Sequence, residues 1–520
     1  MTDNLKTSGQ PGSQDIETVE DTDRAEEHLF DLSRPFFFTD KAFVPALPVE
    51  NLGEAEFLAR HNMKYPYIAG AMANGITGVR MVKTMADHGM TGFFGAGGLS
   101  PDRIEQAVLE LKSTLDGKPF GFNLIHSPGD PEHEMAVAQL YLRHGITLVS
   151  AAAFMRMTLP LVYYRVKGLY TDETGRVVAP NRIIAKVSRV EVAERFFSPP
   201  PEKLVQQLYE KGLVTEREKE LSGYIPMAHD LTAEADSGGH TDNRPAITLL
   251  PTMLALKNEM ALKFKYPDPL CVGLGGGIST PQAAAAAFQM GAAYILTGSV
   301  NQSCVEAEIS EDVKQLLCQA QQADMAMAPS ADMFEIGARV QVLKRGTMFP
   351  LKAEKLYTLY RRYDRFEDLP KKEKKHVEEK ILMSDFETEW KRTKEFFASR
   401  GNRKEIEKAQ SDPRHKMALV FRSYLGLASK WAIKGEDERK MDYQIWCGPA
   451  MGAFNQWVKG SFLEIPENRE TALIALNILF GAAVLTRASW IKRQGVYLPD
   501  HVMDFRPVEN IVSRLNRNFI

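Results

Sequence analysis

The sequence predicts an α/β fold: a closed TIM-type (β/α)8 barrel followed by an all-helical C-terminal domain. Eight short apolar runs alternate with amphipathic stretches of helical length from about residue 60 to residue 321, a pattern typical of a parallel sheet with helical crossovers. Eight is also the number of strands that closes such a barrel, and the segment matches its usual size of about 250 residues. Beyond residue 330, helical patterns continue without a regular strand pattern. A doubly wound open sheet is the competing α/β fold.

The N-terminal residues 1–34 have the composition of a solvated tail. The first thirty contain eight acidic residues against two basic ones, and they offer little to bury. They also lack the apolar core of a signal peptide. We therefore expect a disordered acidic tail and a cytoplasmic protein.

The barrel is expected over residues 35–325. Its candidate strands are Tyr67–Ala71, Thr91–Phe94, Phe120–Leu124, Thr147–Ala151, Ile183–Val187, Met227–Glu234, Cys271–Leu274 and Ala293–Thr297. The helical patterns between and after them are Val79–His88, Arg103–Leu115, Glu132–His144, Glu202–Lys211, Ala246–Lys263, Thr280–Met290 and Cys304–Gln321. Longer connections at about 155–180 and 190–225 are read as inserts, which in a barrel would cap the catalytic face.

Residues 326–520 predict a helical domain that packs on the barrel. Its helical patterns are Leu351–Tyr363, Lys371–Leu382, Phe386–Ser399 and Glu470–Ile491. The run Ala472–Leu485 is apolar on nearly all sides, which indicates a buried helix. It is interrupted by Asn477 and is shorter than the roughly 20 residues of a membrane span. Such apolar content is too great to leave in water.

Composition excludes several classes of protein. The net charge is −3 and the pI is about 6.5, whereas a protein that works mainly by coating nucleic acid would be basic. The four cysteines form no CxxC pair, which disfavours a disulfide scaffold and a thiolate zinc site and fits a reducing cytosol. No histidine recurs four residues after His133 in Glu132-His133-Glu134, so a zincin motif is absent and no metal site is expected.

Glycines gather where the last two strands end. Gly276 and Gly277 follow the seventh candidate strand, and Gly298 and Ser299 follow the eighth. Loops at these positions bind phosphate in many barrels, because free N–H groups before a helix attract an anion. Tight turns between strand and helix would give the same glycines. The GxGxxG and P-loop motifs are both incomplete.

Further motifs carry a resemblance to a known family. Ala235-Asp236-Ser237-Gly238-Gly239-His240, the glycine loop and Thr297-Gly298-Ser299 resemble the nitronate monooxygenase family and its FMN-dependent enoyl reductases. Three later segments, at 324–334, 342–350 and 446–455, resemble PfaD-type subunits, the trans-acting enoyl reductases of polyunsaturated fatty acid and polyketide synthases. The resemblance covers roughly residues 35–520.

The resemblance implies an FMN-binding barrel with a defined set of site residues. The loop along the flavin ring corresponds to Ala69, Gly70, Ala71, Met72 and Ala73, and further flavin contacts to Asn123, Lys186, Asp236, Gly238, Gly239, Gly276, Gly277, Gly298 and Ser299. At Asp236 the enoyl reductases usually carry glutamate. His240 is the candidate proton donor, since an imidazole titrates near neutrality, and His126 is a weaker candidate.

The implied reaction is the reduction of an enoyl thioester held on an acyl carrier protein. NADPH would be the reductant, with NADH as the alternative. The sequence does not decide between a monomer and a homodimer. A basic group of Arg339, Lys344, Arg345 and Lys352 would dock the acidic carrier. Two other functions are kept: oxidation of a nitronate by a flavin, and a docking or structural role within a megasynthase.

Overall fold

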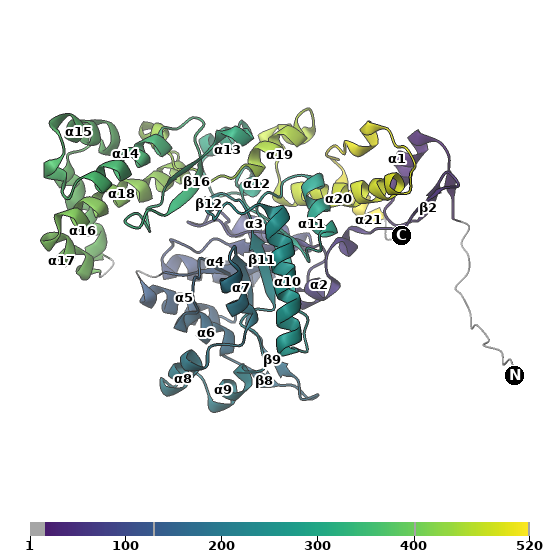
Figure 1. Ribbon diagram of the computed structural model, residues 1–520, viewed down its shortest axis with the longest axis horizontal. Helices are drawn as coiled ribbons and strands as arrows, with labels where there is room; N and C mark the ends of the chain where they lie inside the picture. The colour runs from purple at the N-terminus through teal and green to yellow at the C-terminus, as the bar shows by residue number, and fades with distance from the viewer. Residues whose placement is uncertain (1–15, 128–129, 400–401, 518–520) are drawn as a thin grey trace.

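The computed structural model describes residues 16–127, 130–399 and 402–517, and its centre is a closed parallel barrel of eight strands (Figure 1). The strands are β4 (Tyr67–Ala69), β5 (Thr91–Phe94), β6 (Gly121–Ile125), β7 (Leu148–Ala152), β10 (Arg182–Val187), β11 (Asp230–Glu234), β13 (Cys271–Gly275) and β14 (Ile295–Thr297). Each pairs with its neighbour in parallel, and β14 closes on β4. The barrel and all eight predicted strands are confirmed.

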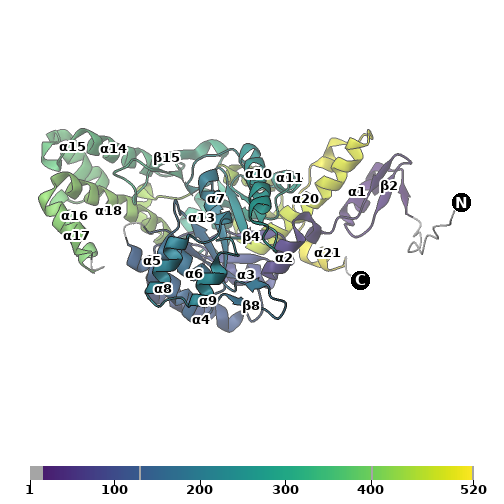
Figure 2. The same cartoon turned by 60° about the horizontal axis from the view of Figure 1, so that its bottom comes forward.

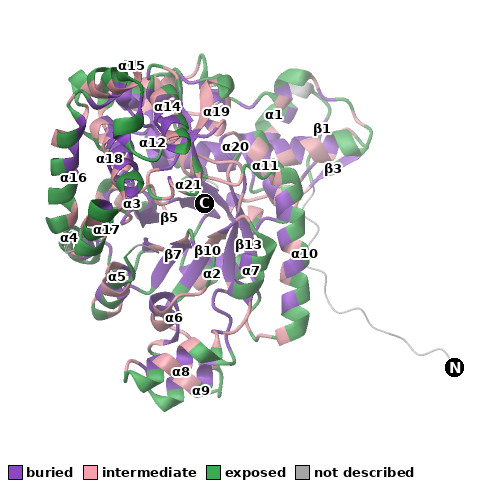
Figure 3. Cartoon of the chain, turned by 60° about the vertical axis from the view of Figure 1, so that its left-hand side comes forward, coloured by how far each residue is buried: buried purple, intermediate pink, exposed green. Residues whose placement is uncertain are grey.

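The barrel helices begin where the sequence supplies capping groups. They include α3 (Val79–Asp87), α4 (Pro101–Thr114), α5 (Pro131–Arg143), α10 (Ala246–Phe264) and α11 (Pro281–Gln289). Ser100, Asp130 and Thr280 accept backbone N–H bonds at the starts of α4, α5 and α11, each followed by proline, a strong start signal. Figure 3 shows the strands buried and the helices exposed on their outer faces.

Beyond Met155 and Arg156, which line the barrel mouth, the two connections at 155–180 and 190–225 do not cap the catalytic face as expected. Each begins with a barrel helix, α6 (Leu159–Val166) or α7 (Val190–Phe197), that leads away from the strand ends. The remaining elements are β8 (Tyr170–Thr171), β9 (Val177–Val178), α8 (Glu202–Glu210) and α9 (Glu216–Ser222), which lie at the opposite end of the barrel from β12 (Gly239–His240) (Figure 1). The prediction was wrong because the short patterns of α6 and α7 were not recognised as helices.

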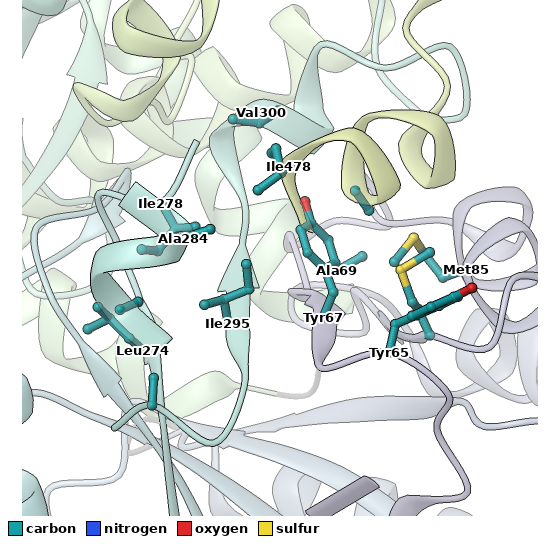
Figure 4. Packing of buried hydrophobic residues seen from close by; sticks show 14 of the residues in the cluster. Tyr65, Tyr67, Ala69, Met85, Leu274, Ile278, Ala284, Ile295, Val300 and Ile478 are labelled. Carbon is teal, nitrogen blue, oxygen red and sulfur yellow. The ribbon is translucent and has the colours of Figure 1, made fainter. Parts of the chain in front are cut away.

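The eighth barrel helix comes from near the C-terminus. α20 (Thr471–Arg493) packs along α11 and also contacts α3 and β4, and Ile478 lies close to Tyr67 in Figure 4. It therefore occupies the place between the seventh and first helices. In the described chain, α20 alone has the length and composition to cross a membrane. However, 89% of its most apolar 18-residue segment is buried inside the protein, as in a core helix.

The chain between β14 and α20 forms an insertion over the barrel mouth. It contains α12 (Ser299–Gln302), α13 (Glu311–Cys318), the hairpin β15 (Met325–Pro329) and β16 (Arg339–Leu343), α14 (Phe349–Arg362), α15 (Lys371–His376) with a π-helical turn (Val377–Leu382), α16 (Phe386–Ser399), α17 (Arg403–Ser411), α18 (Pro413–Lys434) and α19 (Ala450–Val458). The expected helical domain is thus corrected twice: it opens with a β-hairpin, and its last long helix belongs to the barrel. The predicted helix Cys304–Gln321 is shorter in the structure, where α13 is the helix that lies within this range.

The prediction of a disordered tail over residues 1–34 is wrong for residues 16–34. Residues 1–15 lie outside the described residues, but β1 (Thr18–Val19), α1 (Thr22–Phe30), β2 (Phe36–Phe38) and β3 (Ala42–Val44) form a small unit beside α20 (Figure 2). Ala25 and Leu29 are fully buried. The buried guanidinium of Arg487 in α20 donates to the carbonyls of His28, Leu29, Asp31 and Arg34. The acidic composition suggested a solvated segment and gave no sign of these contacts with Arg487.

Candidate active site

The C-terminal ends of the strands open into a cavity of about 2030 Å³. The predicted residues that line it are Gly70, Ala71, Met72, Ala73, Asn123, Lys186, Asp236, Gly238, Gly239, His240, Gly276, Gly277, Gly298 and Ser299. Ala69 does not line the cavity, because it is the last residue of β4 and is fully buried. The barrel thus brings together residues from six of its strand ends.

The two glycine loops form a cradle with open space above it. A Cβ added at Gly277 or Gly298 would meet no atom within 4 Å, and Gly277 has φ +76°. Neither amide N–H finds an acceptor in the described part of the chain. Gly276 has a different role: at φ +90° its added Cβ would lie 2.6 Å from the Ala235 carbonyl. The cradle can therefore accept an anion on Gly277 and Gly298.

The loop after β4 and Asn123 form the next part of the wall. The Gly70 amide donates to the Thr297 carbonyl at 2.9 Å, and the Met72 amide donates to Thr77 Oγ1 at 2.9 Å, which holds the loop flat across the mouth. Asn123 Oδ1 accepts from the Gly97 amide at 3.2 Å. Its Nδ2 has no acceptor in the described chain and is free to bind a ligand in the cavity.

An ion pair joins two neighbouring strands at the mouth. Lys186 Nζ lies 2.6 Å from Glu234 Oε1, so the lysine charge is balanced and held in one place. The sequence prediction omitted Glu234, although it ends the sixth strand. Asp236 instead accepts from the side-chain amides of Asn243 and Gln341, both at 2.8 Å, which indicates that it fixes the loop.

His240 is paired with a carboxylate from the insertion. β12 pairs antiparallel with β16, which places His240 opposite Val340. His240 Nε2 lies 3.0 Å from Asp332 Oδ1. Burial disfavours the imidazolium, but the hydrogen bond and charge of Asp332 outweigh it and raise the pKa of His240. The side chain remains 49% exposed, so a ligand can reach it. Sequence reasoning gave Asp332 no role.

Trp446 and Gly448, which lie far along the chain from the barrel strands, also line the cavity. Trp446 forms a β-bridge with Val342, and the Gly448 amide donates to Ser299 Oγ at 3.0 Å. A Cβ added at Gly238 would lie 2.8 Å from the Cys447 nitrogen. This packing therefore requires glycine at position 238. Burial raises the pKa of the Cys447 thiol to about 12, so that thiol is not a nucleophile.

His126 is anchored to the protein. Its Nδ1 lies 3.0 Å from Glu134 Oε2, and that carboxylate is 2% exposed and also accepts from the Ser127 amide and Thr158. These contacts hold His126 and Ser127 against α5. No group of three or more His, Cys, Asp or Glu side chains with metal-binding geometry occurs among the described residues.

The cavity extends beyond the strand ends to the insertion helices. Its outer part lies against α16 and α18 and is lined by Met155, Ile336, Phe396, Phe397 and Leu427. The first three are among the exposed large apolar side chains of the protein. Gly426 of α18 also lines it, and an added Cβ there would meet no atom within 4 Å. We call this region the outer arm of the cavity.

The predicted basic group is mostly neutralised. Arg339 pairs with Glu354, Arg345 with Asp324 and Lys352 with Asp442. Lys344 is exposed. Three of the four charges are therefore balanced by carboxylates of the same chain, so the group does not form a broad cationic surface.

Comparison with known proteins agrees with this architecture. The family model described as nitronate monooxygenase matches residues 56–346, and that of the inserted helical domain of [acyl-carrier-protein] S-malonyltransferase matches residues 363–443. The second match spans α15 to α18, which carry the wall of the outer arm.

Individual relatives are synthase proteins. The chain is 45% identical over 459 residues to the polyketide biosynthesis protein PksE of Bacillus subtilis, covering 88% of this chain and 59% of PksE. It is 44% identical to one of the subunits of a polyunsaturated fatty acid synthase from a Thraustochytrium species, covering 85% of this chain and 30% of the relative. The chain thus spans less than two thirds of either relative.

A solved structure matches over its whole length. The crystal structure of the enoyl reductase domain of MlnA, from the macrolactin biosynthesis cluster of Bacillus amyloliquefaciens, is 38% identical with a TM-score of 0.82. The alignment covers 86% of this chain and 100% of that domain. The chain therefore belongs to the nitronate monooxygenase family, and within it the chain is similar to PfaD-like proteins of polyunsaturated fatty acid and polyketide synthases.

Proposed function

We propose that the protein is an FMN-dependent enoyl reductase that acts in trans on enoyl thioesters carried by an acyl carrier protein, with NADPH as reductant and NADH as the alternative. The observation that carries the proposal is the cradle at Gly277 and Gly298, whose free N–H groups share one cavity with the His240–Asp332 pair. The likeness to the MlnA enoyl reductase domain supports it.

The residues at the mouth fit FMN. The phosphate would bind the N–H groups of Gly277 and Gly298, where a side chain on either glycine would fill the space. The ring would lie along the loop Gly70–Ala73, with Asn123 Nδ2 as a donor. Lys186, held by Glu234, would favour negative charge on the ring. Bound FMN would supply the hydride chemistry, taking two electrons from the nicotinamide and returning them to the β-carbon of the enoyl thioester.

The protein would supply the proton. In the imidazolium form His240 holds protons on both nitrogens, and Nε2 is committed to Asp332. Its Nδ1 has no partner in the described chain, so Nδ1 can give a proton to the substrate α-carbon. Asp332 supports this step because its hydrogen bond and charge raise the pKa of His240 and so favour the protonated form.

The outer arm would hold the acyl chain and its carrier arm. Pockets for one small ligand commonly measure about 300–1,000 Å³, so a cavity of about 2030 Å³ has room for a flavin and a second molecule. Its apolar wall suits an acyl chain. The insertion resembles part of an enzyme whose name includes the acyl carrier protein, which favours carrier docking near α15–α18. We expect a cytoplasmic protein beside the carrier domains of its synthase.

The test is turnover of an enoyl thioester by the purified protein. The proposal predicts flavin absorption and NADPH oxidation that depends on crotonyl thioester. Nitronate oxidation with O2 and no crotonyl turnover would favour the monooxygenase function. A protein that takes up no flavin would favour the docking role.

A further inference from the structure

Gln302 carries a buried amide without a partner beside the glycine cradle. The residue is 2% exposed, and its Nε2 finds no hydrogen-bond acceptor in the described chain. It lines the same cavity as Gly298 and Ser299. Native proteins seldom leave a buried donor unpaired, and such a donor facing a cavity points to a missing acceptor.

The helix geometry directs this amide at the cradle. The backbone N–H of Gln302 donates to the Gly298 carbonyl at 3.2 Å, so the two residues are one helical turn apart. Residues four apart share a helix face, and side chains lean toward the helix N-terminus. The side chain of Gln302 therefore covers the turn that begins at Gly298.

The donors of the cradle itself are neutral groups. Three cations that line the cavity already have partners: Lys186 with Glu234 at 2.6 Å, Arg189 with Asp242 at 3.0 Å, and Arg422 with Glu335 at 3.0 Å. In the part of the chain that the structure describes, the backbone N–H groups of Gly277 and Gly298 and the Nε2–H of Gln302 lack acceptors. A phosphate oxygen is the acceptor that this donor set fits.

We infer that Gln302 is a phosphate ligand of the flavin, whose Nε2–H donates to a phosphate oxygen and thereby selects FMN over riboflavin. The inference rests on the FMN site of the proposed function but not on the reaction. A phosphate ligand at this position would explain why a polar amide is buried there without a partner in the described chain.

The test compares FMN and riboflavin binding to flavin-free, full-length protein by quenching of flavin fluorescence. Gln302→Met removes the donor and keeps the length of the side chain. We expect its Kd for FMN to rise at least about tenfold, the effect of one hydrogen bond to a charged group. Its Kd for riboflavin should change less than twofold. Gln319→Met, on the exposed surface, should change neither.

Thermal unfolding of the same flavin-free proteins separates binding from folding. Removing an unpaired buried amide should leave the midpoint of Gln302→Met equal to or above that of wild type. Unchanged FMN affinity in Gln302→Met would overturn the inference, and so would equal losses for FMN and riboflavin. A wild-type protein that binds neither flavin would contradict the proposed function as well.

Discussion

His240 Nε2 lies 3.0 Å from Asp332 Oδ1, across 92 positions of sequence. The histidine lies in β12, in the loop that follows barrel strand β11, and the aspartate lies between the two strands of the insertion hairpin. This pair connects the barrel to the insertion at the point where the proposed substrate would react. The contribution of this pair to the rate of reduction can be measured by replacing either His240 or Asp332.

Replacing His240 by alanine should keep FMN bound and slow enoyl thioester reduction at least about a hundredfold, the size of a typical general-acid contribution. Its side chain makes no contact with the glycine cradle through a described hydrogen bond. Flavin content and kcat of the purified variant are the measurements. Wild-type turnover in this variant would remove the proton-donor role from His240.

Replacing Asp332 by asparagine should lower the pKa of His240, because it removes the charge that raises it. The protonated imidazole is the active form, so activity falls as pH rises through this pKa. The alkaline limb of the kcat profile should therefore move to lower pH in Asp332→Asn. Glu354→Gln, which removes a carboxylate paired with Arg339 of the same hairpin, is the control and should keep the wild-type profile. Identical profiles for all three proteins would contradict the coupling.

Replacing Gly298 by valine should release FMN, since the new side chain would project into open space above the cradle. Its φ of −131° is negative, so the left-handed strain that a side chain at Gly277 would suffer is avoided. Gly223→Val is the control far from the mouth, because Gly223 also has a negative φ and an added Cβ there would make one ordinary contact, 3.9 Å from the Glu220 carbonyl. The measurement is the flavin-to-protein absorbance ratio. Full flavin loading of Gly298→Val would show that the phosphate does not bind at Gly298.

Replacing Gly426 by leucine should shorten the range of acyl chains that are reduced. The substitution fills open space in the outer arm and should stabilise α18, because glycine inside a helix costs about 0.5–1 kcal/mol relative to alanine. We expect kcat/KM to fall for long-chain enoyl thioesters and to stay near wild type for crotonyl thioester. A parallel loss on both substrates would mean that the outer arm does not hold the chain.

A chain ending near residue 330 should be aggregated or poor in flavin. It lacks α20, and with it the apolar surface that covers α11, α3 and β4. The segment Trp446–Gly448 that packs on Gly238 and Ser299 is also missing. Gel filtration and the flavin absorbance of the fragment check this. A monomeric, FMN-loaded fragment would show that the barrel is complete without α20.

Local sequence patterns predicted the parts of the fold that depend on local chemistry. The strand cores and the glycine loops follow from apolar runs and from turn residues, and the structure has them at those positions. The place of α20 was not predictable in this way, because periodicity shows that Ala472–Leu485 is buried but not what it is buried against. The roles of Asp332, Glu234 and Gln302 depend on partners or empty space that only the folded chain defines. Arg487 likewise holds α1 through carbonyl groups that no sequence pattern marks.

The most direct test of the central claim is an anaerobic absorbance experiment on the full-length protein loaded with FMN. NADPH should bleach the flavin bands, and crotonyl thioester added without oxygen should restore them. That result would establish that one site accepts electrons from the nicotinamide and passes them to an enoyl thioester. Bands that return only when O2 is admitted, with the thioester left unreduced, would contradict the account.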